Sequence, residues 1–153
     1  MQMEATLKTW KTSRKIYLNL MNNYTLDQLN KIPDGFNNNL IWNVGHVIVA
    51  QQSLIYKSSN LPIYISEELV NLYKPGTKPT GTTSQEEVNE LKELLINLIA
   101  QTEADLQKHI FTTYNERTTG TGFHLASIED AIVYNNYHEG LHLGYMMSLR
   151  KFV

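Results

Sequence analysis

The sequence predicts an all-α protein, specifically an antiparallel four-helix bundle with a long excursion between its second and third helices. Three observations lead to this prediction. Apolar residues recur at helical spacing in four long segments, all four prolines fall between those segments, and no convincing pair of strands is apparent. The length of 153 residues suits one domain with a buried core, so we expect residues 1–153 to form a single domain.

The first two expected helices differ in how their apolar residues are distributed. The first, roughly residues 4–30, has apolar residues at helical spacing: Leu7, Trp10, Tyr17, Leu20, Met21 and Tyr24. The second, roughly residues 39–57, is apolar around much of its circumference, which is typical of a helix at the centre of a bundle.

The second half of the chain contains clear helix start signals. A loop with a short helical stretch, SEELVNLY, is followed by KPGTKPTGTT, which we interpret as an irregular connection. Ser84 and Glu87 then form a capping-box pattern that predicts the start of the third helix. After a polar, glycine-containing loop, Ser127 and Asp130 predict the start of the last helix, which runs to about Phe152.

The composition excludes several classes of partner. A formal net charge of −2, with Lys and Arg scattered along the chain, gives no electrostatic basis for binding nucleic acid. Apolar runs such as LLINLIA are too short to span a membrane, and the N-terminal stretch MQMEATLKTWK has no apolar segment fit for a secretion signal. We therefore expect a cytoplasmic protein. Because the chain has no cysteine, any metal must be held by histidine, carboxylate or water.

The stretch HEGLH, residues 138–142, matches the H-E-x-x-H pattern of zinc proteases. At 100° per residue, His138 and His142 share the stripe of the last helix that is expected to face the core, about 6 Å apart along the axis. Each ring could instead be hydrogen-bonded to a neighbour such as Asn135 or a tyrosine. Because two unpaired polar rings are costly to bury, a shared metal ion is the favoured interpretation.

A third ligand would have to be one of the remaining histidines, His46, His109 or His124. His46 lies one turn after Trp42 and beside Gly45, in apolar surroundings where an imidazole needs a partner. His109 lies near the end of the third helix, where it could equally interact with the helix dipole. His124 lies in a loop and is expected to be exposed. We rank His46 first and His109 second.

The protease interpretation fails on its third ligand. That chemistry uses two histidines and a third protein ligand, usually a downstream Glu or His, with the intervening Glu as general base. Only LGYMMSLRKFV follows His142, and it contains neither residue type. Glu139 is rotated by about 80° from the midline between the two histidines. We interpret it as a solvated residue on the helix surface, with a base beside the metal ligands as the alternative.

W-N-V-G-H at residues 42–46, followed by H-E-x-x-H-x-G at residues 138–144, resembles the DinB-like family of damage-inducible four-helix proteins. The resemblance extends to the helix order and the long excursion, so it covers nearly the whole chain. It implies a metal site made by one histidine of the second helix and two of the fourth, which are His46, His138 and His142 here. The chain departs from many relatives at Tyr145, where they have Gln.

The resemblance also implies a range of activities and cofactors. Some members resemble bacillithiol- or mycothiol-dependent S-transferases, which implies a divalent metal and a low-molecular-weight thiol. Zinc is the first expectation, with nickel, cobalt or iron as alternatives. A three-histidine site leaves a coordination position at which a thiol or water can be activated. We expect a metal-dependent thiol S-transferase or hydrolase acting on a small molecule. The alternatives are a non-catalytic, stress-related bundle that binds a metal or small ligand, and a scaffold whose histidines are only hydrogen-bonded.

The last helix carries a second apolar stripe, formed by Val133, Tyr137, Gly140, Gly144 and Met147 on the side opposite the histidines. Interior glycines destabilise a helix by up to about 1 kcal/mol each relative to alanine. Two glycines spaced by four therefore indicate the close approach of another helix, from the same bundle or from a second subunit. A homodimer would also resemble the habit of the family, and we expect one.

Overall fold

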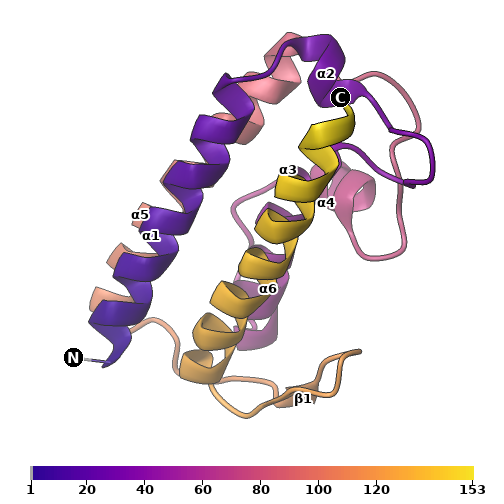
Figure 1. Cartoon of the computed structure of the whole chain (residues 1–153). Helices are drawn as coiled ribbons and strands as arrows, with labels where there is room; N and C mark the ends of the chain where they lie inside the picture. Colours follow the sequence, from indigo (N-terminus) through magenta and orange to yellow (C-terminus); the bar gives the residue numbers. More distant parts are fainter. Residues whose placement is uncertain (1) are drawn as a thin grey trace.

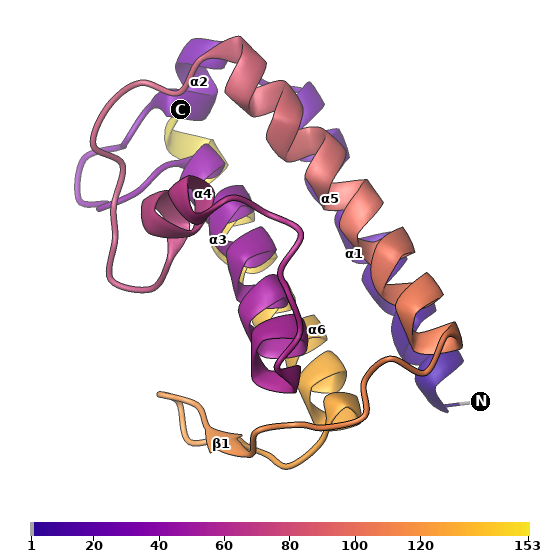
Figure 2. The same cartoon turned by 180° about the vertical axis from the view of Figure 1, so that it is seen from behind.

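The computed structural model describes residues 2–153, with side chains described from residue 3 onward. The four long helices are α1 (Gln2–Asn22), α3 (Leu40–Gln51), α5 (Gln85–Gln107) and α6 (Ile128–Leu149). Figures 1 and 2 show α1 beside α5 and α3 beside α6, so the helices form two layers. Because α1 also packs on α6, and α3 on α5, the layers close into the predicted all-α bundle.

The second helical segment ends close to where the sequence predicted. A π-helical turn, η1 (Gln52–Tyr56), and a 3-10 turn, η2 (Lys57–Ser59), continue α3 without a break. Asn60 then adopts a left-handed backbone conformation with φ 58°, which ends the helical run. A short polar side chain such as Asn tolerates this conformation better than most residues do.

The first helix is shorter than predicted. Instead of one helix over residues 4–30, the chain ends α1 at Asn22 and starts a separate helix, α2 (Leu26–Asn30). Thr25 starts α2 through a reciprocal capping box, in which its hydroxyl accepts from the Gln28 amide N–H and the Gln28 side chain accepts from the Thr25 N–H. These bonds satisfy backbone N–H groups that a continuous helix would have paired with carbonyls of the preceding turn. They therefore favour the start of a new helix at this point.

The excursion between α3 and α5 contains the expected short helix, α4 (Glu67–Tyr73), followed by an irregular stretch over residues 74–83. Both predicted helix starts are confirmed. The Ser84 hydroxyl accepts from the Glu87 N–H at 3.2 Å to start α5. The Ser127 hydroxyl accepts from the Asp130 N–H at 3.2 Å to start α6. The last helix continues through a 3-10 turn, η3 (Arg150–Phe152).

A small antiparallel ribbon precedes α6, although the sequence had suggested no paired strands. Its strands are β1 (Arg117–Thr118) and β2 (His124–Leu125), in which Arg117 pairs with Leu125 and Thr118 with His124. Gly122, with φ 90°, supplies a left-handed residue in the turn between them. Strands of two residues are too short to produce a detectable alternation, which is why the sequence pattern missed them.

The hydrophobic core lies where the four long helices meet. Its largest cluster draws on all of them, and its fully buried members include Tyr17, Met21, Val47, Ile48, Leu95 and Met146. A second cluster surrounds Trp10 and Ile55 toward the other end of the bundle. Within residues 2–153, no helix is both long enough and apolar enough to cross a membrane.

Candidate metal centre

The structure brings together the three histidines that the sequence favoured. His46 comes from α3, whereas His138 and His142 lie one turn apart on α6. Their ring centroids are 5.2 Å apart for His46 and His138, 4.7 Å for His46 and His142, and 4.6 Å for His138 and His142. One nitrogen from each ring lies within 4.8 Å of the other two.

The orientation of His46 is set by its helix neighbours and by the end of α4. Its ring stacks on Trp42, with centroids 4.8 Å apart and planes at 10°. The Nδ1–H donates to the backbone carbonyl of Tyr73 at 2.8 Å, which leaves Nε2 as the nitrogen with a free lone pair. Tyr73 can come this close because residue 45 is glycine: a Cβ at Gly45 would overlap the Tyr73 ring.

His142 is oriented by Asn43, which belongs to the same W-N-V-G-H stretch as His46. Its Nδ1 lies 2.8 Å from the Asn43 side-chain oxygen. The Asn43 amide nitrogen donates to the Asn38 side chain and the Asn39 carbonyl, so the oxygen is the end that faces His142 and accepts. Nε2 of His142 is thereby left as the ligand nitrogen. The side chain of Asn43 therefore orients His142. His46 is oriented by a backbone carbonyl and not by a tyrosine hydroxyl.

His138 differs from the other two because a polar atom of its ring is left unsatisfied. Its Nδ1 is buried and has no hydrogen-bond partner among residues 3–153. Buried polar atoms of this kind are few in folded proteins and call for an explanation such as a bound ion. Burial and the neighbouring His46 lower the pKa of His138 to about 4.

The other two rings are also held neutral, because burial lowers the pKa of each. Burial lowers the pKa of His46, although its bond to the Tyr73 carbonyl acts in the opposite direction. Burial, followed by the neighbouring His138 and His46, lowers the pKa of His142 to about 3. Neutral imidazole is the form that binds metals. At neutral pH the cluster is therefore a set of three uncharged donors.

The two remaining histidines lie outside this cluster. His109 follows the end of α5, is exposed, and has a left-handed φ of 54°. His124 lies on β2, is also exposed, and its Nε2 lies 3.2 Å from a Glu116 carboxylate oxygen. The sequence-based ranking of His46 ahead of His109 agrees with these positions.

Glu139 is not solvated, so the sequence-based interpretation of this residue is wrong. It is fully buried, and both of its carboxylate oxygens are engaged. Oε1 accepts from Trp10 Nε1 at 2.8 Å, Arg14 Nη2 at 2.7 Å and Asn135 Nδ2 at 2.8 Å, while Oε2 accepts from Arg14 Nε at 2.8 Å. A carboxylate saturated in this way has no role as a general base for the neighbouring histidines.

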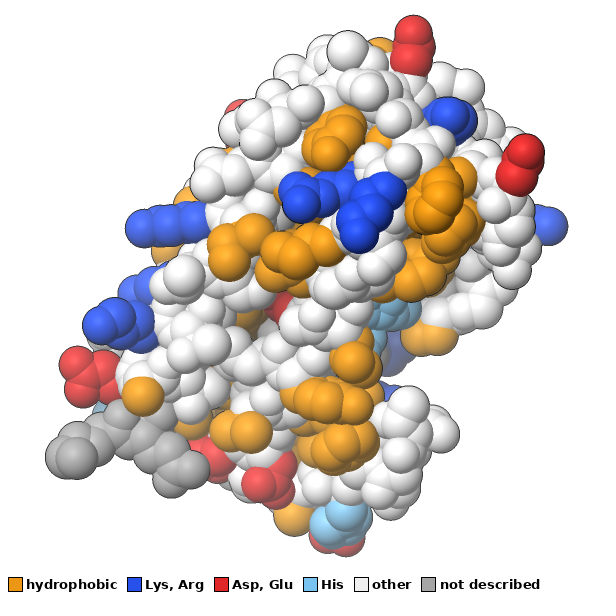
Figure 3. All heavy atoms as spheres, in the orientation of Figure 1, with side chains coloured by type: hydrophobic (Ala, Val, Ile, Leu, Met, Phe, Trp, Pro, Cys, Tyr) orange, Lys and Arg blue, Asp and Glu red, His pale blue; other side chains and the backbone are white. Residues whose placement is uncertain are grey.

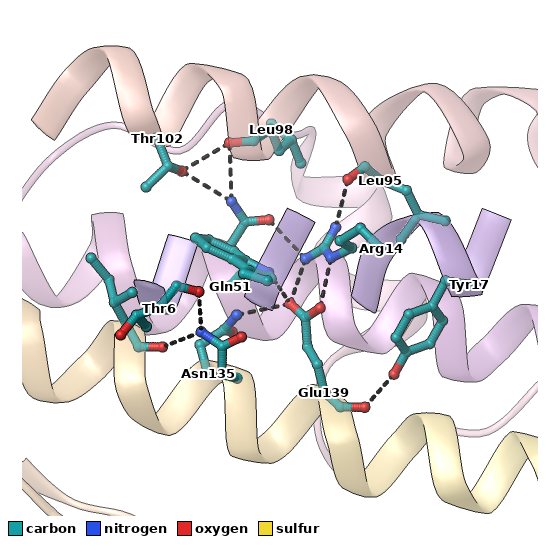
Figure 4. Close-up of polar contacts among 12 residues, drawn as sticks. Thr6, Arg14, Tyr17, Gln51, Leu95, Leu98, Thr102, Asn135 and Glu139 are labelled. Atoms are coloured by element: carbon teal, nitrogen blue, oxygen red, sulfur yellow. Dashed lines mark hydrogen bonds and ion pairs between the residues drawn. The ribbon is translucent and has the colours of Figure 1, made fainter. Parts of the chain in front are cut away.

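Figure 4 shows how Arg14 and Glu139 join the helices around them. Arg14 also donates to the Leu95 carbonyl at 3.2 Å and to the Gln51 side chain at 3.0 Å, which links α1 to α5 and α3. The Tyr17 hydroxyl donates to the Glu139 backbone carbonyl at 2.6 Å, and burial raises the pKa of that hydroxyl far above its usual range. The network therefore fixes the rotation of α6, and with it the direction of the histidines.

A sequence signal for this network was present. Arg14 stands on the same face of the first helix as Leu7, Trp10 and Tyr17, at spacings of three and four residues. A lone arginine on an apolar stripe predicts a buried acidic partner, because an unpaired charge is too costly to bury. Glu139 was the acidic residue at the edge of the inward stripe of α6.

The histidine cluster is reached from two hollows. The more enclosed, with a cavity volume of about 330 Å³, is lined by His46 and His138. A more open hollow, of about 390 Å³, is lined by His142, Asn43 and Tyr145. Tyr145 therefore lies beside the second hollow. An ion between the three rings would not be enclosed by protein on all sides.

The donor set fits a divalent metal ion. Three nitrogens bound tetrahedrally to one ion are about 3.4 Å apart, so small ring rotations from the present spacing of at most 4.8 Å would suffice. Two rings already present a free Nε2, and the third has a buried nitrogen without a partner among the described residues. Three imidazoles suit zinc, nickel, cobalt and ferrous iron alike.

The fold and the site together define a class: an all-α bundle in which facing helices supply three histidines suited to a metal ion. The chain belongs to the DinB superfamily, whose family model matches residues 9–146. A search of curated proteins finds no significant match. Among solved structures, the chain is similar to a conserved protein from Enterococcus faecalis, with a TM-score of 0.61 and 13% identity over 98% of this chain and 95% of the other. At this identity, the likeness supports the fold alone.

Proposed function

We propose that this protein is a metal-dependent enzyme in which His46, His138 and His142 hold one divalent ion. The observation that carries the proposal is that three neutral rings each place one nitrogen within 4.8 Å of the other two, with His46 and His138 on the wall of an open pocket. Zinc is the first expectation, with nickel, cobalt and iron as alternatives. An ion held by three protein ligands retains an open position, at which it supplies Lewis acidity to a thiol or water.

The residues of the chain have distinct tasks in this proposal. Asn43 and the Tyr73 carbonyl hold two imidazoles in the tautomer that presents Nε2 inward. The hydrophobic surroundings of His46, including the stacked Trp42, exclude water from one side of the site. Glu139 has no part in the chemistry of this proposal, because its oxygens already accept hydrogen bonds from Arg14 and its neighbours. A thiol or water proton would therefore leave through solvent in the pocket or through the substrate.

The reaction class that we propose is S-transfer from a low-molecular-weight thiol to a small molecule, or hydrolysis of a small molecule. The absence of cysteine in the chain fits the first reaction, because the sulfur nucleophile would come from the cofactor. DinB superfamily membership and an accessible site on the pocket wall are compatible with both.

The metal proposal is tested by elemental analysis of the untagged protein. We expect about one divalent ion per chain, and its loss together with activity in His142→Ala. His124→Ala is the matched control, because His124 is an exposed histidine outside the cluster. Wild-type protein that takes up no ion from zinc-, nickel-, cobalt- or iron-containing buffer would overturn the proposal.

A second candidate function is a non-catalytic bundle that sequesters a metal or small ligand. The unsatisfied His138 nitrogen supports metal binding without requiring turnover. A panel of thiol-dependent and hydrolytic assays on the metal-loaded protein separates the two candidates: turnover lost in His142→Ala favours the enzyme, and stoichiometric metal without any turnover favours sequestration.

We also propose that the second apolar stripe of α6 pairs with a second copy of the chain. Val133, Tyr137 and Met147 are 50%, 47% and 38% exposed, and Figure 3 shows hydrophobic side chains exposed on the face over α6. A Cβ on Gly140 or Gly144 would meet no atom within 4 Å, so within the described chain no helix packs closely against them. Sedimentation at tens of micromolar tests this proposal, and a monomer there would contradict it.

A further inference from the structure

The more enclosed pocket beside the histidine cluster, which is lined by His46 and His138, has a size and composition suited to a small molecule. Its volume of about 330 Å³ falls within the usual range for ligand sites. Its lining includes His46 and His138 together with the apolar side chains of Val49, Ile63 and Val70. These residues belong to α3, α6 and the excursion that follows α3.

Among residues 3–153, three cations line the same pocket and no acidic residue does. They are Lys57 at the end of the α3 run, Lys74 after α4 and Arg117 on β1. Within residues 3–153 none of the three forms an ion pair, although Lys74 donates to the Asn71 side chain. The three charges have been brought together from separate segments, and they repel one another unless an anion lies between them.

An acidic residue in an adjoining hollow is paired elsewhere and does not neutralise this group. Glu116 borders an adjoining hollow that also includes Lys57 and Arg117. Its carboxylate lies 3.2 Å from His124 Nε2, and its side chain is 66% exposed. The pocket itself therefore keeps an excess of positive charge.

A buried donor on the pocket wall supports the same conclusion independently. Gln52 is 1% exposed and lines the pocket, and its side-chain oxygen accepts from the Tyr64 N–H at 2.8 Å. Its side-chain NH₂ has no partner among residues 3–153. An unsatisfied buried amide donor is costly, and an anionic oxygen is the strongest partner for it.

We propose that this pocket binds a small anionic molecule bearing at least one phosphate group or two carboxylate groups. Its anionic end contacts Lys57, Lys74 and Arg117, with Gln52 as an additional donor. Its other end lies against Val49 and Ile63 and extends toward the histidines, so in the enzymatic case this molecule is a substrate or cofactor of the proposed metal centre. That last step rests on the proposed function, whereas the anion site itself does not.

The test is carried out first on metal-free protein, so that an ion cannot bind the probe directly. Succinate, inorganic phosphate and the neutral analogue succinamide are titrated by NMR or calorimetry. We expect succinate or phosphate to bind with a Kd on the order of 1 mM, and succinamide to bind at least about tenfold more weakly. Preference for succinate would indicate carboxylates, and preference for phosphate would indicate a phosphorylated ligand. Equal binding of succinate, phosphate and succinamide would overturn the proposal.

Single charge-removal variants locate the site. Lys57→Gln and Arg117→Gln are expected to weaken succinate or phosphate binding by about tenfold. Both residues are exposed, so the fold is expected to tolerate the changes. Lys15→Gln is the matched control, since Lys15 is an exposed lysine of α1 that does not line the pocket. Equal loss in all three variants, or no loss in the first two, would overturn the proposal.

The metal-centre proposal and the anion-pocket proposal can be disproved independently of each other. Charge-dependent anion binding by protein that takes up no metal would leave the pocket proposal standing and remove the metal centre. Stoichiometric metal, with anion binding insensitive to Lys57→Gln and Arg117→Gln, would do the reverse.

Discussion

Two polar clusters lie on neighbouring flanks of α6, and they differ in how completely their hydrogen-bonding capacity is used. Glu139 and Arg14 are fully buried, and both oxygens of the carboxylate have partners. His138, the adjacent residue, keeps a buried nitrogen without a partner among the described residues and faces a pocket. A structural ion pair needs all of its hydrogen-bonding atoms to have partners within the protein. A binding site needs atoms that are still free to bind a ligand. Neighbours within one five-residue motif therefore have different roles.

The largest effect is expected when only one partner of the buried Arg14–Glu139 pair is removed. Arg14→Met leaves Glu139 buried without its positive partner. Removing one member of a buried pair destabilises a protein by about 3–5 kcal/mol, so we expect a large fall in the free energy of unfolding, measured by urea denaturation of the metal-free protein. The double variant Arg14→Met with Glu139→Leu removes both charges and is expected to regain much of the loss. A single variant as stable as the wild type would contradict a structural role for the pair.

The buried histidine cluster is expected to make the stability of the metal-free protein fall in mild acid. The pKa values of His138 and His142 are about 4 and 3 in the folded protein, against about 6.5 in the unfolded chain. Below pH 6.5 the unfolded chain binds protons that the folded protein does not, so stability falls as pH decreases toward 4. The limiting slope is about 1.4 kcal/mol per pH unit for each histidine.

This pH dependence is measured by urea denaturation between pH 7 and pH 5, above the range in which ordinary carboxylates titrate. The control is a variant with His138→Gln and His142→Gln, whose slope should be much flatter. An identical slope in wild type and control would show that other groups cause the sensitivity. Added metal should shift the loss of stability to lower pH, because protons and the ion compete for the same nitrogens.

A smaller effect is expected at the glycine beside the site. Gly45→Ala places a methyl group where the Tyr73 ring lies, and overpacking of this kind costs about 1–3 kcal/mol. Because Tyr73 also orients His46, metal affinity should fall together with the thermal midpoint. Gly140→Ala is the matched control, since its Cβ would meet nothing within 4 Å, and in a monomer it should stabilise α6 by up to about 1 kcal/mol. Equal behaviour of the two variants would contradict the close Tyr73 contact.

The smallest effect is expected from His124→Gln. His124 and Glu116 form an exposed pair, and such pairs contribute little to stability. The change in unfolding free energy should stay within about 0.5 kcal/mol, and metal content should be unchanged. A variant that loses its metal would show that this loop histidine takes part in the site.

Much of the fold and of the candidate site was predictable because it depends on local signals. The caps at Ser84 and Ser127 are set by residues three positions away, and the shared direction of His138 and His142 follows from helical periodicity alone. The end of α1 was missed although T-L-D-Q at residues 25–28 carries a capping-box pattern, because the apolar spacing continues across it.

The position of Glu139 could not be derived from its own helix. It lies at the edge of the inward stripe, and such an edge is solvated or buried according to whether a neighbouring helix covers it. In this bundle α6 contacts both α1 and α3, so the edge is covered. The partner, Arg14, is 125 residues away in the chain, and no local pattern joins the two. Only the apolar stripe around Arg14 signalled that it needed a counter-charge.

The origin of the pocket residues has a consequence for how this scaffold can change. The three histidines stand on α3 and α6, whereas Lys57, Lys74 and Arg117 come from the end of a helical run, a connecting segment and a short ribbon. Altering the length or charge of those outer segments would change which molecule is admitted while the rings stay in register. In the proposed enzyme, ligand selectivity and ion binding are therefore carried by different segments, and grafting new segments onto the same helices would be a route to new ligands.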